Sequence, residues 1–352
     1  MTSLIERMQN SGAIKHTSIL KDSLFFNVKD TVATEIPIIN IALSGRIDHG
    51  LSSGLTFLAG ESKNFKSLLG LMLLKSYLTK YTDAVCLFYD SEFGITPEYI
   101  EANGIDTSRV IHIPIEHLEQ LKFDIAKRLG EISRGDKVFI FIDSIGNLAS
   151  KKEAEDALEE KSVADMTRAK VLKSIWRIVT PHLAIKDIPC VAINHTYQTM
   201  EMYAKAVMSG GTGGMYSANQ VFIITRAQDK DGTDLKGYNF TINIEKSRFV
   251  REKSKFPFNV RFQGGINKWS GLLNIAMEAK LVVKPNVGWY SKVDPETGEI
   301  EEKKYRAKDT DTSDFWMNII KSARFAEFLR NRYQLSSAAL ISDEPDETDE
   351  TD

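Results

Sequence analysis

Residues 54–75 read GLTFLAGESKNFKSLLGLMLLK, and this stretch decides the predicted fold. An apolar run from Leu55 to Ala59 ends at Gly60, and Lys66 and Ser67 begin a second apolar stretch with helical spacing. The polar loop between them consists of Glu61, Ser62, Lys63, Asn64 and Phe65. A strand, a short loop, a lysine, a hydroxyl and a helix follow one another in this order in a nucleotide-binding P-loop.

Phe65 departs from the P-loop pattern G-x-x-x-x-G-K-[ST], which has glycine directly before the lysine. Taken alone, the loop therefore fits an ordinary strand–turn–helix as well as it fits a phosphate-binding loop. The choice between these two interpretations depends on what the rest of the chain carries.

The composition is that of an ordinary globular protein, with 352 residues of which 42% are apolar and 26% charged. No apolar run approaches the ~20 residues that span a bilayer, and the N-terminus lacks the pattern of a signal peptide. We therefore expect no membrane association and a cytoplasmic location. Cys86 and Cys190 lie inside apolar runs, as packed thiols do in a reducing compartment.

The net charge of −3 hides an asymmetry between the body of the chain and its C-terminus. The last ten residues, DEPDETDETD, hold seven carboxylates and no base, whereas residues 1–342 carry 45 Lys and Arg against 41 Asp and Glu. A weakly basic body with an acidic tail suits a protein that meets a polyanion. Solvated termini are often acidic, so the charge alone is weak evidence.

Strand and helix patterns alternate through the middle of the chain. Short apolar runs that indicate buried strands lie at 55–59, 84–89, 110–113, 137–142 and 188–193. Helical spacing is found at 67–80, 97–103, 117–133 and 163–184. This alternation predicts an α/β fold with a mainly parallel sheet covered by helices on both faces. Later runs are predicted as antiparallel or edge strands at 220–226, 238–245 and 257–262.

The chain divides into four parts by pattern. We predict an N-terminal segment at 1–30, a core at 31–265, a small C-terminal domain at 266–335 and an acidic disordered tail at 336–352. The short helix predicted at 2–10 cannot bury its own apolar face. It therefore docks either on its own core or on a neighbouring copy.

Polar side chains directly follow four of the predicted strands. They are Lys66 and Ser67, Asp90 and Glu92, Asp143 and Ser144, and Asn194 and His195. The carboxyl ends of parallel strands lie along one edge of a sheet, where α/β proteins bind their ligands. The convergence of four such ends predicts one site and favours the P-loop interpretation.

These side chains match the parts of an ATP site. Lys66 would neutralise phosphate charge and Ser67 would bind Mg²⁺, while loop amides cradle the phosphates. Asp143 would hold the metal through water, Glu92 would orient an attacking water, and His195 would bond to the γ-phosphate. Considered singly, Asp143 fits a helix N-cap equally well, and His195 is better explained as a buried histidine with its hydrogen bonds made. No other histidine has ligand spacing, so Mg²⁺ is the one metal predicted.

With these positions in place, the chain resembles the RecA family of strand-exchange ATPases, and within it the UvsX recombinases of T-even bacteriophages. The resemblance covers roughly residues 30–335. Its motifs are IALSGRIDHG, GESKNFKS, FYDSEFGITPEYIEANGID, FIDSIGNLASKKEAEDAL, INHTYQT, SGGTGGMYSA, GGIN and GWY. The phage branch tolerates an aromatic residue at the position of Phe65, and we expect a compensating backbone shift near Asn64.

The resemblance implies a RecA-like ATPase core with a mainly parallel central sheet, an N-terminal docking segment and a small C-terminal domain. It implies Glu92 as the catalytic carboxylate, together with Lys66 and His195, and Tyr99 as a surface on which adenine stacks. His195 stands where bacterial RecA proteins have glutamine. Two further residues of the family pattern, which would reach the ATP of an adjacent subunit, match Lys246 and Arg248.

The two DNA-facing loops of the family correspond to about 150–161 and 196–217. In the second loop, glycines would let backbone amides approach phosphates, and apolar side chains would lie against bases. The first loop is net acidic and the second is poor in basic residues. DNA binding without sequence preference would therefore rest on backbone amides and a few cations. The DNA-binding residues implied in and near these loops are Arg168, Tyr197, Lys205, Gly210, Gly211, Gly213 and Gly214.

The implied function is that of an ATP-dependent homologous recombinase. Such a protein forms a helical filament on single-stranded DNA, pairs it with homologous duplex DNA and exchanges strands, with DNA-stimulated ATP hydrolysis at subunit interfaces. Implied partners are a mediator or loader protein and a single-strand-binding protein, in recombination, repair and replication of phage DNA in the host cytoplasm. We hypothesise that the acidic tail competes with DNA or contacts these partners.

Two other functions remain open from the sequence. A hexameric RecA-fold helicase would share the ATP site, although the free N-terminal segment and the lack of a translocation domain argue against it. An ATP-binding scaffold without hydrolysis gains support from Phe65. The presence of both Glu92 and Asp143 ranks it last.

Overall fold

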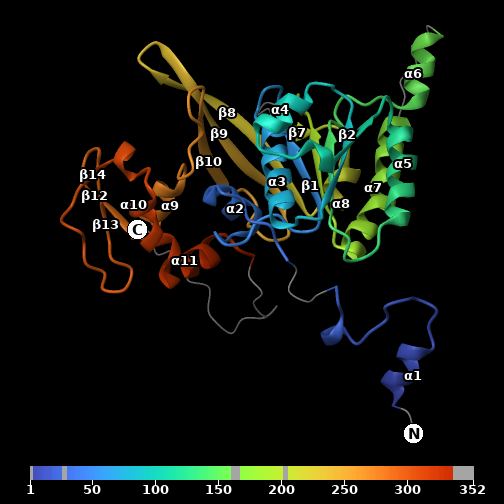
Figure 1. Ribbon diagram of the computed structural model, residues 1–352, viewed down its shortest axis with the longest axis horizontal. Helices are drawn as coiled ribbons and strands as arrows, with labels where there is room; N and C mark the ends of the chain where they lie inside the picture. The colour runs from blue at the N-terminus through green and yellow to red at the C-terminus, as the bar shows by residue number, and fades with distance from the viewer. Residues whose placement is uncertain (1–2, 26–29, 160–166, 201–204, 336–352) are drawn as a thin grey trace.

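The computed structural model describes residues 3–25, 30–159, 167–200 and 205–335, and its centre is one nine-stranded sheet (Figure 1). The order of the strands across the sheet is β11-β10-β9-β8-β1-β5-β4-β2-β3. Their bounds are β1 (Gly54–Ala59), β2 (Val85–Asp90), β3 (Val110–Pro114), β4 (Val138–Asp143), β5 (Pro189–Asn194), β8 (Gln220–Asp231), β9 (Asp234–Ser247), β10 (Lys255–Arg261) and β11 (Gly265–Ile266).

The six strands from β8 to β3 run parallel, and β9, β10 and β11 continue the sheet in antiparallel pairs. This confirms the predicted α/β fold with a mainly parallel sheet. The prediction for 220–226 is wrong in part, because β8 is an interior strand that runs parallel to β1. Its first five residues are all buried, as a strand covered on both faces requires.

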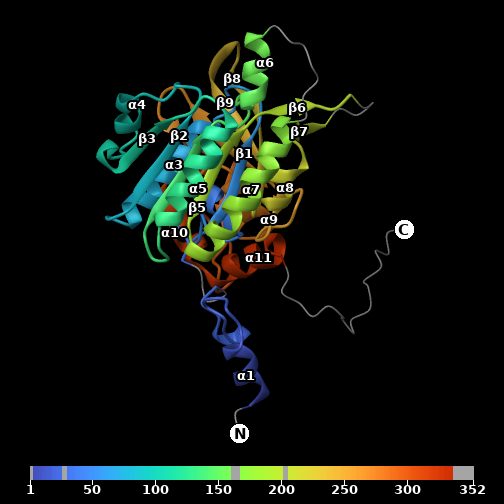
Figure 2. The same cartoon turned by 90° about the vertical axis from the view of Figure 1, so that its right-hand side faces the viewer.

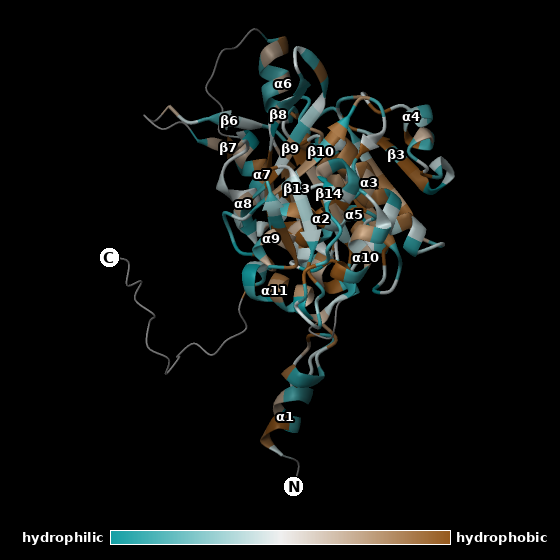
Figure 3. Cartoon of the chain, turned by 90° about the vertical axis from the view of Figure 1, so that its left-hand side faces the viewer, coloured by the Kyte–Doolittle hydropathy of each residue, from teal (hydrophilic) through white to brown (hydrophobic). Residues whose placement is uncertain are grey.

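Helices cover both faces of the sheet. On one face lies α3 (Lys66–Lys80), and on the other α5 (Leu118–Glu131) packs beside α7 (Thr167–Lys186), as Figure 2 shows. Alternate residues of one strand serve the two faces: Phe139 and Phe141 of β4 join the α3 side, whereas the isoleucines between and after them join the other. Apolar colour in Figure 3 accordingly concentrates on the strands.

The remaining helices of the core are short. They are α2 (Pro37–Ser44), α4 (Pro97–Ala102), α6 (Lys151–Leu158) and α8 (Thr212–Ser217). Proline opens α2 and Gly45, with a φ of 71°, closes it, which are ordinary start and stop signals. The helix predicted from residue 163 is described from Thr167 onward, because 160–166 lie outside the described residues.

The stretch 196–217, which has no clear period in the sequence, contains a small hairpin followed by α8. Its strands are β6 (Thr196–Gln198) and β7 (Ala206–Met208), paired in antiparallel register from Thr196 with Met208. The pair projects from the main sheet beside α7 and α8 (Figure 2). Residues 201–204 at its turn lie outside the described residues.

The C-terminal region packs against the α3 side of the core. Its elements are α9 (Leu272–Glu278), β12 (Val282–Asn286), β13 (Trp289–Lys292), β14 (Tyr305–Arg306), α10 (Ser313–Lys321) and α11 (Ala323–Tyr333). Trp269, Phe315 and Trp316 are buried in an apolar cluster that continues into the α3 side of the core. The boundary predicted at residue 265 falls within β11 and stays a prediction.

The N-terminal helix α1 (Leu4–Asn10) stands away from the rest of the chain (Figures 1 and 2). It buries no residue, and its apolar side chains Leu4, Ile5 and Met8 are about 60% exposed. The uncovered apolar face of this helix, which Ser3 and Glu6 cap at its start, is consistent with docking. The docking itself stays a prediction. The acidic tail lies outside the described residues, and no described helix is long and apolar enough to cross a bilayer.

Candidate nucleotide-binding site

The loop between β1 and α3 has an unusual backbone around Asn64. Both neighbours of this residue are left-handed, Lys63 with a φ of 63° and Phe65 with a φ of 61°. A left-handed φ favours glycine, which explains the glycine of the ordinary P-loop pattern at position 65. Here the Phe65 ring packs 5.1 Å from the ring of Phe240 and 5.6 Å from that of Phe258, centre to centre. Aromatic packing thus holds a conformation that the backbone alone disfavours.

A second anchor fixes the loop to β8. The Asn64 side chain is buried, and its Nδ2 donates to the carbonyl oxygen of Ile224 at 2.8 Å. Gly60 lies against the same carbonyl, where an added Cβ would come within 2.6 Å of the oxygen. The loop is therefore held at both ends of its polar stretch before any ligand binds.

Lys66 begins α3 and turns its amine back over the loop. Its Nζ donates to the carbonyl oxygen of Glu61 at 2.6 Å. Burial lowers the pKa of Lys66, while the nearby charges of Glu92, Asp143 and Glu61 oppose that shift. Among the described residues this carbonyl is the hydrogen-bond partner of the Lys66 amine, which can exchange the bond for phosphate oxygens.

Asp143 ends β4 beside the loop, with its side chain almost fully buried. Burial raises the pKa of Asp143 to about 6, opposed by the Ser67 hydroxyl and Lys66 and reinforced by Glu92 and Asp90. Its Oδ1 is buried without a hydrogen-bond partner in the described part of the chain. A buried carboxylate oxygen with no donor is an unmet requirement that a cation or its water would satisfy.

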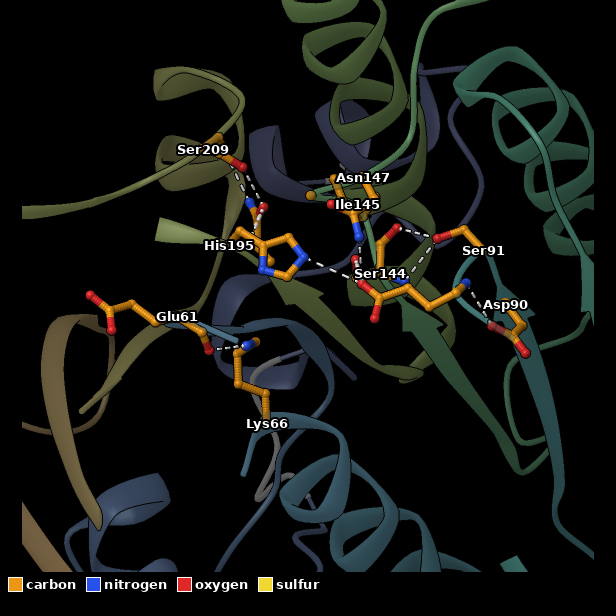
Figure 4. A network of polar contacts seen from close by, with 12 residues as sticks. Glu61, Lys66, Asp90, Ser91, Ser144, Ile145, Asn147, His195 and Ser209 are labelled. Atoms are coloured by element: carbon orange, nitrogen blue, oxygen red, sulfur yellow. Dashed lines mark hydrogen bonds and ion pairs between the residues drawn. The ribbon is translucent and has the colours of Figure 1, made fainter. Parts of the chain in front are cut away.

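One carboxylate oxygen collects three donors at the strand ends. Glu92 Oε1 accepts from Ser144 Oγ at 2.6 Å and from Asn147 Nδ2 at 3.0 Å, and it lies 3.3 Å from His195 Nε2. In Figure 4, Ser144, Asn147 and His195 point toward this one carboxylate. The backbone N–H of Glu92 donates to the buried carboxylate of Asp90 at 3.0 Å.

The end of β5 links this carboxylate to the segment after it. The His195 N–H donates to Asn194 Oδ1 at 2.8 Å, and that oxygen also accepts from Ser209 Oγ at 2.7 Å. Ser209 in turn donates its backbone N–H to the His195 carbonyl at 2.9 Å. The ring of His195 sits over Gly146, where a Cβ would come within 2.2 Å of it. Hydrogen bonds thus link the backbone of His195 to Ser209, both directly and through Asn194.

The strand ends enclose a cavity of about 330 Å³. Its walls include these residues of the predicted site: Ser62, Lys63, Asn64, Phe65, Lys66, Ser67, Glu92, Tyr99, Asp143 and His195. Tyr99 lies on α4 at the rim with 40% of its surface exposed, so its ring is free to stack on a ligand. The structure thus brings the P-loop together with Glu92, Asp143 and His195, which follow separate strands in the sequence.

Two predicted site residues lie elsewhere. Lys246 on β9 donates its Nζ to the carbonyl oxygens of Met215 at 2.8 Å and Tyr216 at 3.0 Å. Arg248, just beyond β9, is exposed. Neither residue lines the cavity of its own chain.

Comparison with known proteins then identifies the family. The family described as RecA N-terminal domain matches residues 29–267, which is more than half of the chain. The family described as the C-terminal domain of the bacteriophage T4 recombination and repair protein matches residues 269–329. The chain belongs to the RecA family.

Individual relatives agree. The recombination and repair protein of Enterobacteria phage T4 is 55% identical over 354 residues, which cover 99% of this chain and 90% of the relative. Protein RecA of Salinispora tropica is 23% identical over 222 residues, 62% of each chain, and protein RecA of a Nocardioides species is 24% identical over 221 residues, 62% of this chain and 61% of the relative. The resemblance is confirmed, and this RecA-family protein is a homologous recombinase and DNA-dependent ATPase of the UvsX type.

The residues that the resemblance assigned to DNA are held in different ways in this RecA-family protein. Tyr197 on β6 is 54% exposed, and Lys205 beside β7 is exposed as well. Gly210 and Gly211 have φ values of 90° and 77°, whereas Gly213 and Gly214 lie where a Cβ would crowd Lys173 and the rings of Phe57 and Trp176. Close packing is thus sufficient reason for the second pair of glycines.

Arg168 is less available to DNA than its sequence position indicates. Its guanidinium donates to three carbonyl oxygens of the loop after β4, those of Ile145, Gly146 and Leu148, at 2.8 to 3.0 Å. Burial lowers the pKa of Arg168. The side chain therefore braces this loop, whatever further contact it makes.

Sequence reasoning gave no role to Asn147 and Ser209, although both contact the strand-end network. Neither residue belongs to a motif with a fixed chemical meaning. Their partners lie 55 and 15 residues away in the chain, so only the fold brings each pair together.

Proposed function

We propose that the protein forms a helical filament on single-stranded DNA, pairs it with homologous duplex DNA and exchanges strands, using ATP hydrolysed between subunits. The observation that carries this proposal is the convergence of Lys66, Glu92, Asp143 and His195 on one cavity in a chain of the RecA family. Domain boundaries at residues 30, 265 and 335 belong to the same proposal.

ATP would lie with its phosphates over the loop and its adenine against Tyr99. The loop amides at the start of α3 and the Lys66 amine would neutralise the phosphates in place of the Glu61 carbonyl. Glu92 would orient the attacking water, and His195 would contact the γ-phosphate. His195 already lies 3.3 Å from Glu92, so a contact with phosphate would change the surroundings of the catalytic carboxylate directly.

Mg²⁺ would be held by Ser67 and, through water, by Asp143. The orphaned Oδ1 of Asp143 and the hydroxyl beside it suit a hard cation that takes oxygen ligands and keeps several waters. The described residues contain no group of three metal-ligating side chains, which agrees with a metal that depends on phosphate oxygens for the rest of its ligands. When bound, the ion would screen phosphate charge as the bond to the γ-phosphorus breaks.

Assembly would join sites from two subunits. Residues 1–30 would dock on the core of a neighbour, which the uncovered apolar face of α1 supports. Lys246 and Arg248 would then reach the ATP of that neighbour, since neither lines its own cavity. Because Lys246 also holds the carbonyls that end α8, contact with ATP would be linked to the DNA-facing segment.

DNA would lie along 150–161 and 196–217, with Tyr197 stacking on a base, Lys205 on a phosphate, and the amides of Gly210, Gly211, Gly213 and Gly214 close to the backbone. Arg168 would support this surface through the loop that it braces. A mediator or loader and a single-strand-binding protein are proposed partners, and the host cytoplasm is the proposed location.

The test is ATP hydrolysis by the full chain with and without single-stranded DNA, followed by electron microscopy of the complex with ATP. We expect DNA to stimulate hydrolysis strongly and the protein to form open helical filaments. Closed rings would favour a hexameric helicase, and the absence of DNA-stimulated hydrolysis would favour the scaffold.

A further inference from the structure

We propose that Asn147 is a positioning residue for hydrolysis, which fixes one oxygen of the Glu92 carboxylate so that the other faces the attacking water. This inference rests on the proposed role of Glu92. No motif assigns a role to Asn147, and its contact with Glu92 is made across 55 residues of sequence.

The hydrogen bonds to Glu92 are unevenly shared between its two oxygens. Ser144, Asn147 and His195 all lie within 3.3 Å of Oε1. Within the described ranges, Oε2 has no hydrogen bond to protein. A carboxylate held by one oxygen keeps the lone pairs of the other for a water, and the side chain cannot rotate without breaking several bonds at once.

The three donors are not equally permanent. Ser144 is fully buried, and its backbone N–H and carbonyl oxygen both bond to the Ser91 hydroxyl, at 3.1 and 2.8 Å. His195 sits on a different strand end, and its Nε2 would leave Oε1 on turning to a γ-phosphate. Asn147 and Ser144 would then be the donors that keep Glu92 in place while the histidine moves.

The loop that carries Asn147 is itself braced. Arg168 donates to the carbonyl oxygens on either side of Asn147, those of Ile145, Gly146 and Leu148. The Asn147 side chain is exposed, so packing alone would not restrict it. The fixed backbone and the bond to Glu92 therefore define its position together, and Arg168 acts on Glu92 through this loop.

The experiment compares three substitutions at Asn147 in the full-length protein, by kcat and KM for ATP with saturating single-stranded DNA. Asn147→Ala removes the donor, Asn147→Gln keeps an amide donor on a longer side chain, and Asn147→Asp keeps the shape but places a second carboxylate against Glu92. We expect Asn147→Ala to lower kcat roughly 5- to 20-fold with KM little changed, less than the full cost of a bond to a charged group because Ser144 and His195 remain at Oε1. Asn147→Asp is expected to lower it further, and Asn147→Gln less.

If Asn147 acted only by packing, Asn147→Asp would lower kcat less than Asn147→Gln, because Asp has the same shape as Asn and Gln is larger. Asn267→Ala is the matched control: Asn267 also donates an exposed amide to a carboxylate, Asp311, at 2.7 Å, but outside the cavity, and its loss should leave kcat unchanged. The double variant Asn147→Ala with Arg168→Ala should lower kcat by less than the product of the two single fold-changes, since both residues act through one loop.

Glu92→Gln separates this inference from the function on which it rests. If Glu92→Gln hydrolyses ATP normally, the proposed catalytic role of Glu92 is wrong. If Glu92→Gln is inactive while Asn147→Ala and Asn147→Asp keep the kcat of the wild type, only the positioning role of Asn147 is overturned. Filament formation by each variant on single-stranded DNA with ATP shows that assembly is intact.

Discussion

The nucleotide cavity and the DNA-facing segment 196–217 hold their functional groups in opposite ways. In the cavity, Lys66 and Asp143 are nearly buried, and Glu92 is fixed by three donors. In the segment, Tyr197 and Lys205 point into solvent from a two-stranded hairpin. A site for one small ligand requires side chains fixed before binding, whereas a surface for DNA of any sequence needs charge and stacking faces that adapt.

This difference predicts that single substitutions cost far more in the cavity. Lys66→Ala should have the largest effect of all, because a buried cation that faces phosphate charge is replaced by nothing. We expect DNA-stimulated ATP hydrolysis to fall by about 100-fold or more, measured as kcat at saturating DNA. Lys66→Arg keeps the charge with a different shape and serves as the control. Wild-type hydrolysis by Lys66→Ala would mean that the cavity is not the ATP site.

The sequence predicts some parts of the fold better than others. Strands β2, β4 and β5 are apolar runs that end in the polar residues Asp90, Asp143 and Asn194, and β1 leads into the polar loop. Their type and their shared rim therefore follow from local pattern. The place of β8 beside β1 does not follow from local pattern, because packing decides the register between strands so far apart in the chain.

Within the site, the predictable residues are those with a fixed chemical meaning at a strand end, such as Glu92 and Asp143. Asn147 and Ser209 gain their roles only from tertiary contacts. Phe65 is an intermediate case. The sequence marks it as a departure from the P-loop pattern, but the rings of Phe240 and Phe258 that accommodate it lie on β9 and β10.

Burial in the cavity also carries a cost in stability, which Asp143 makes measurable. Its pKa of about 6 lies above the ordinary 3.8, so the folded protein holds this proton more tightly than the unfolded chain does. The resulting stabilisation is complete below about pH 4 and is lost as the pH rises through 6. An asparagine side chain at this position would have no charge to bury.

We therefore expect Asp143→Asn to raise the free energy of unfolding by ~1–3 kcal/mol at pH 7.5 in the absence of magnesium and nucleotide. At pH 5 the gain should shrink. Urea denaturation with a chelator present, at both pH values, gives the comparison. A variant less stable than the wild type at pH 7.5 would show that Asp143 is structurally required in its charged form.

Phe65 tests how firmly the backbone of the cavity loop is held. Phe65→Ala loses the ring contacts with Phe240 and Phe258 and keeps the left-handed φ, so we expect a loss of ~1–3 kcal/mol in the free energy of unfolding. Phe65→Gly loses the same contacts but removes the backbone strain. It should therefore be more stable than Phe65→Ala by ~1 kcal/mol. Urea denaturation of the two variants under one condition measures the difference, and equal stabilities would mean that the loop relaxes without strain.

The smallest effect is expected on the DNA-facing hairpin. Lys205→Ala removes one exposed charge from a surface that also uses backbone amides and stacking, so we expect affinity for single-stranded DNA to fall only about 2- to 5-fold at moderate salt. The slope of log affinity against log salt should decrease by roughly 0.7, the change for one phosphate contact on a single strand. Lys127→Ala, on the exposed face of α5, is the matched control and should change neither quantity. A much larger loss at Lys205 with an unchanged salt slope would mean that Lys205 holds the hairpin itself in shape, and the contrast between the fixed cavity and the adaptable DNA surface would fail at this point.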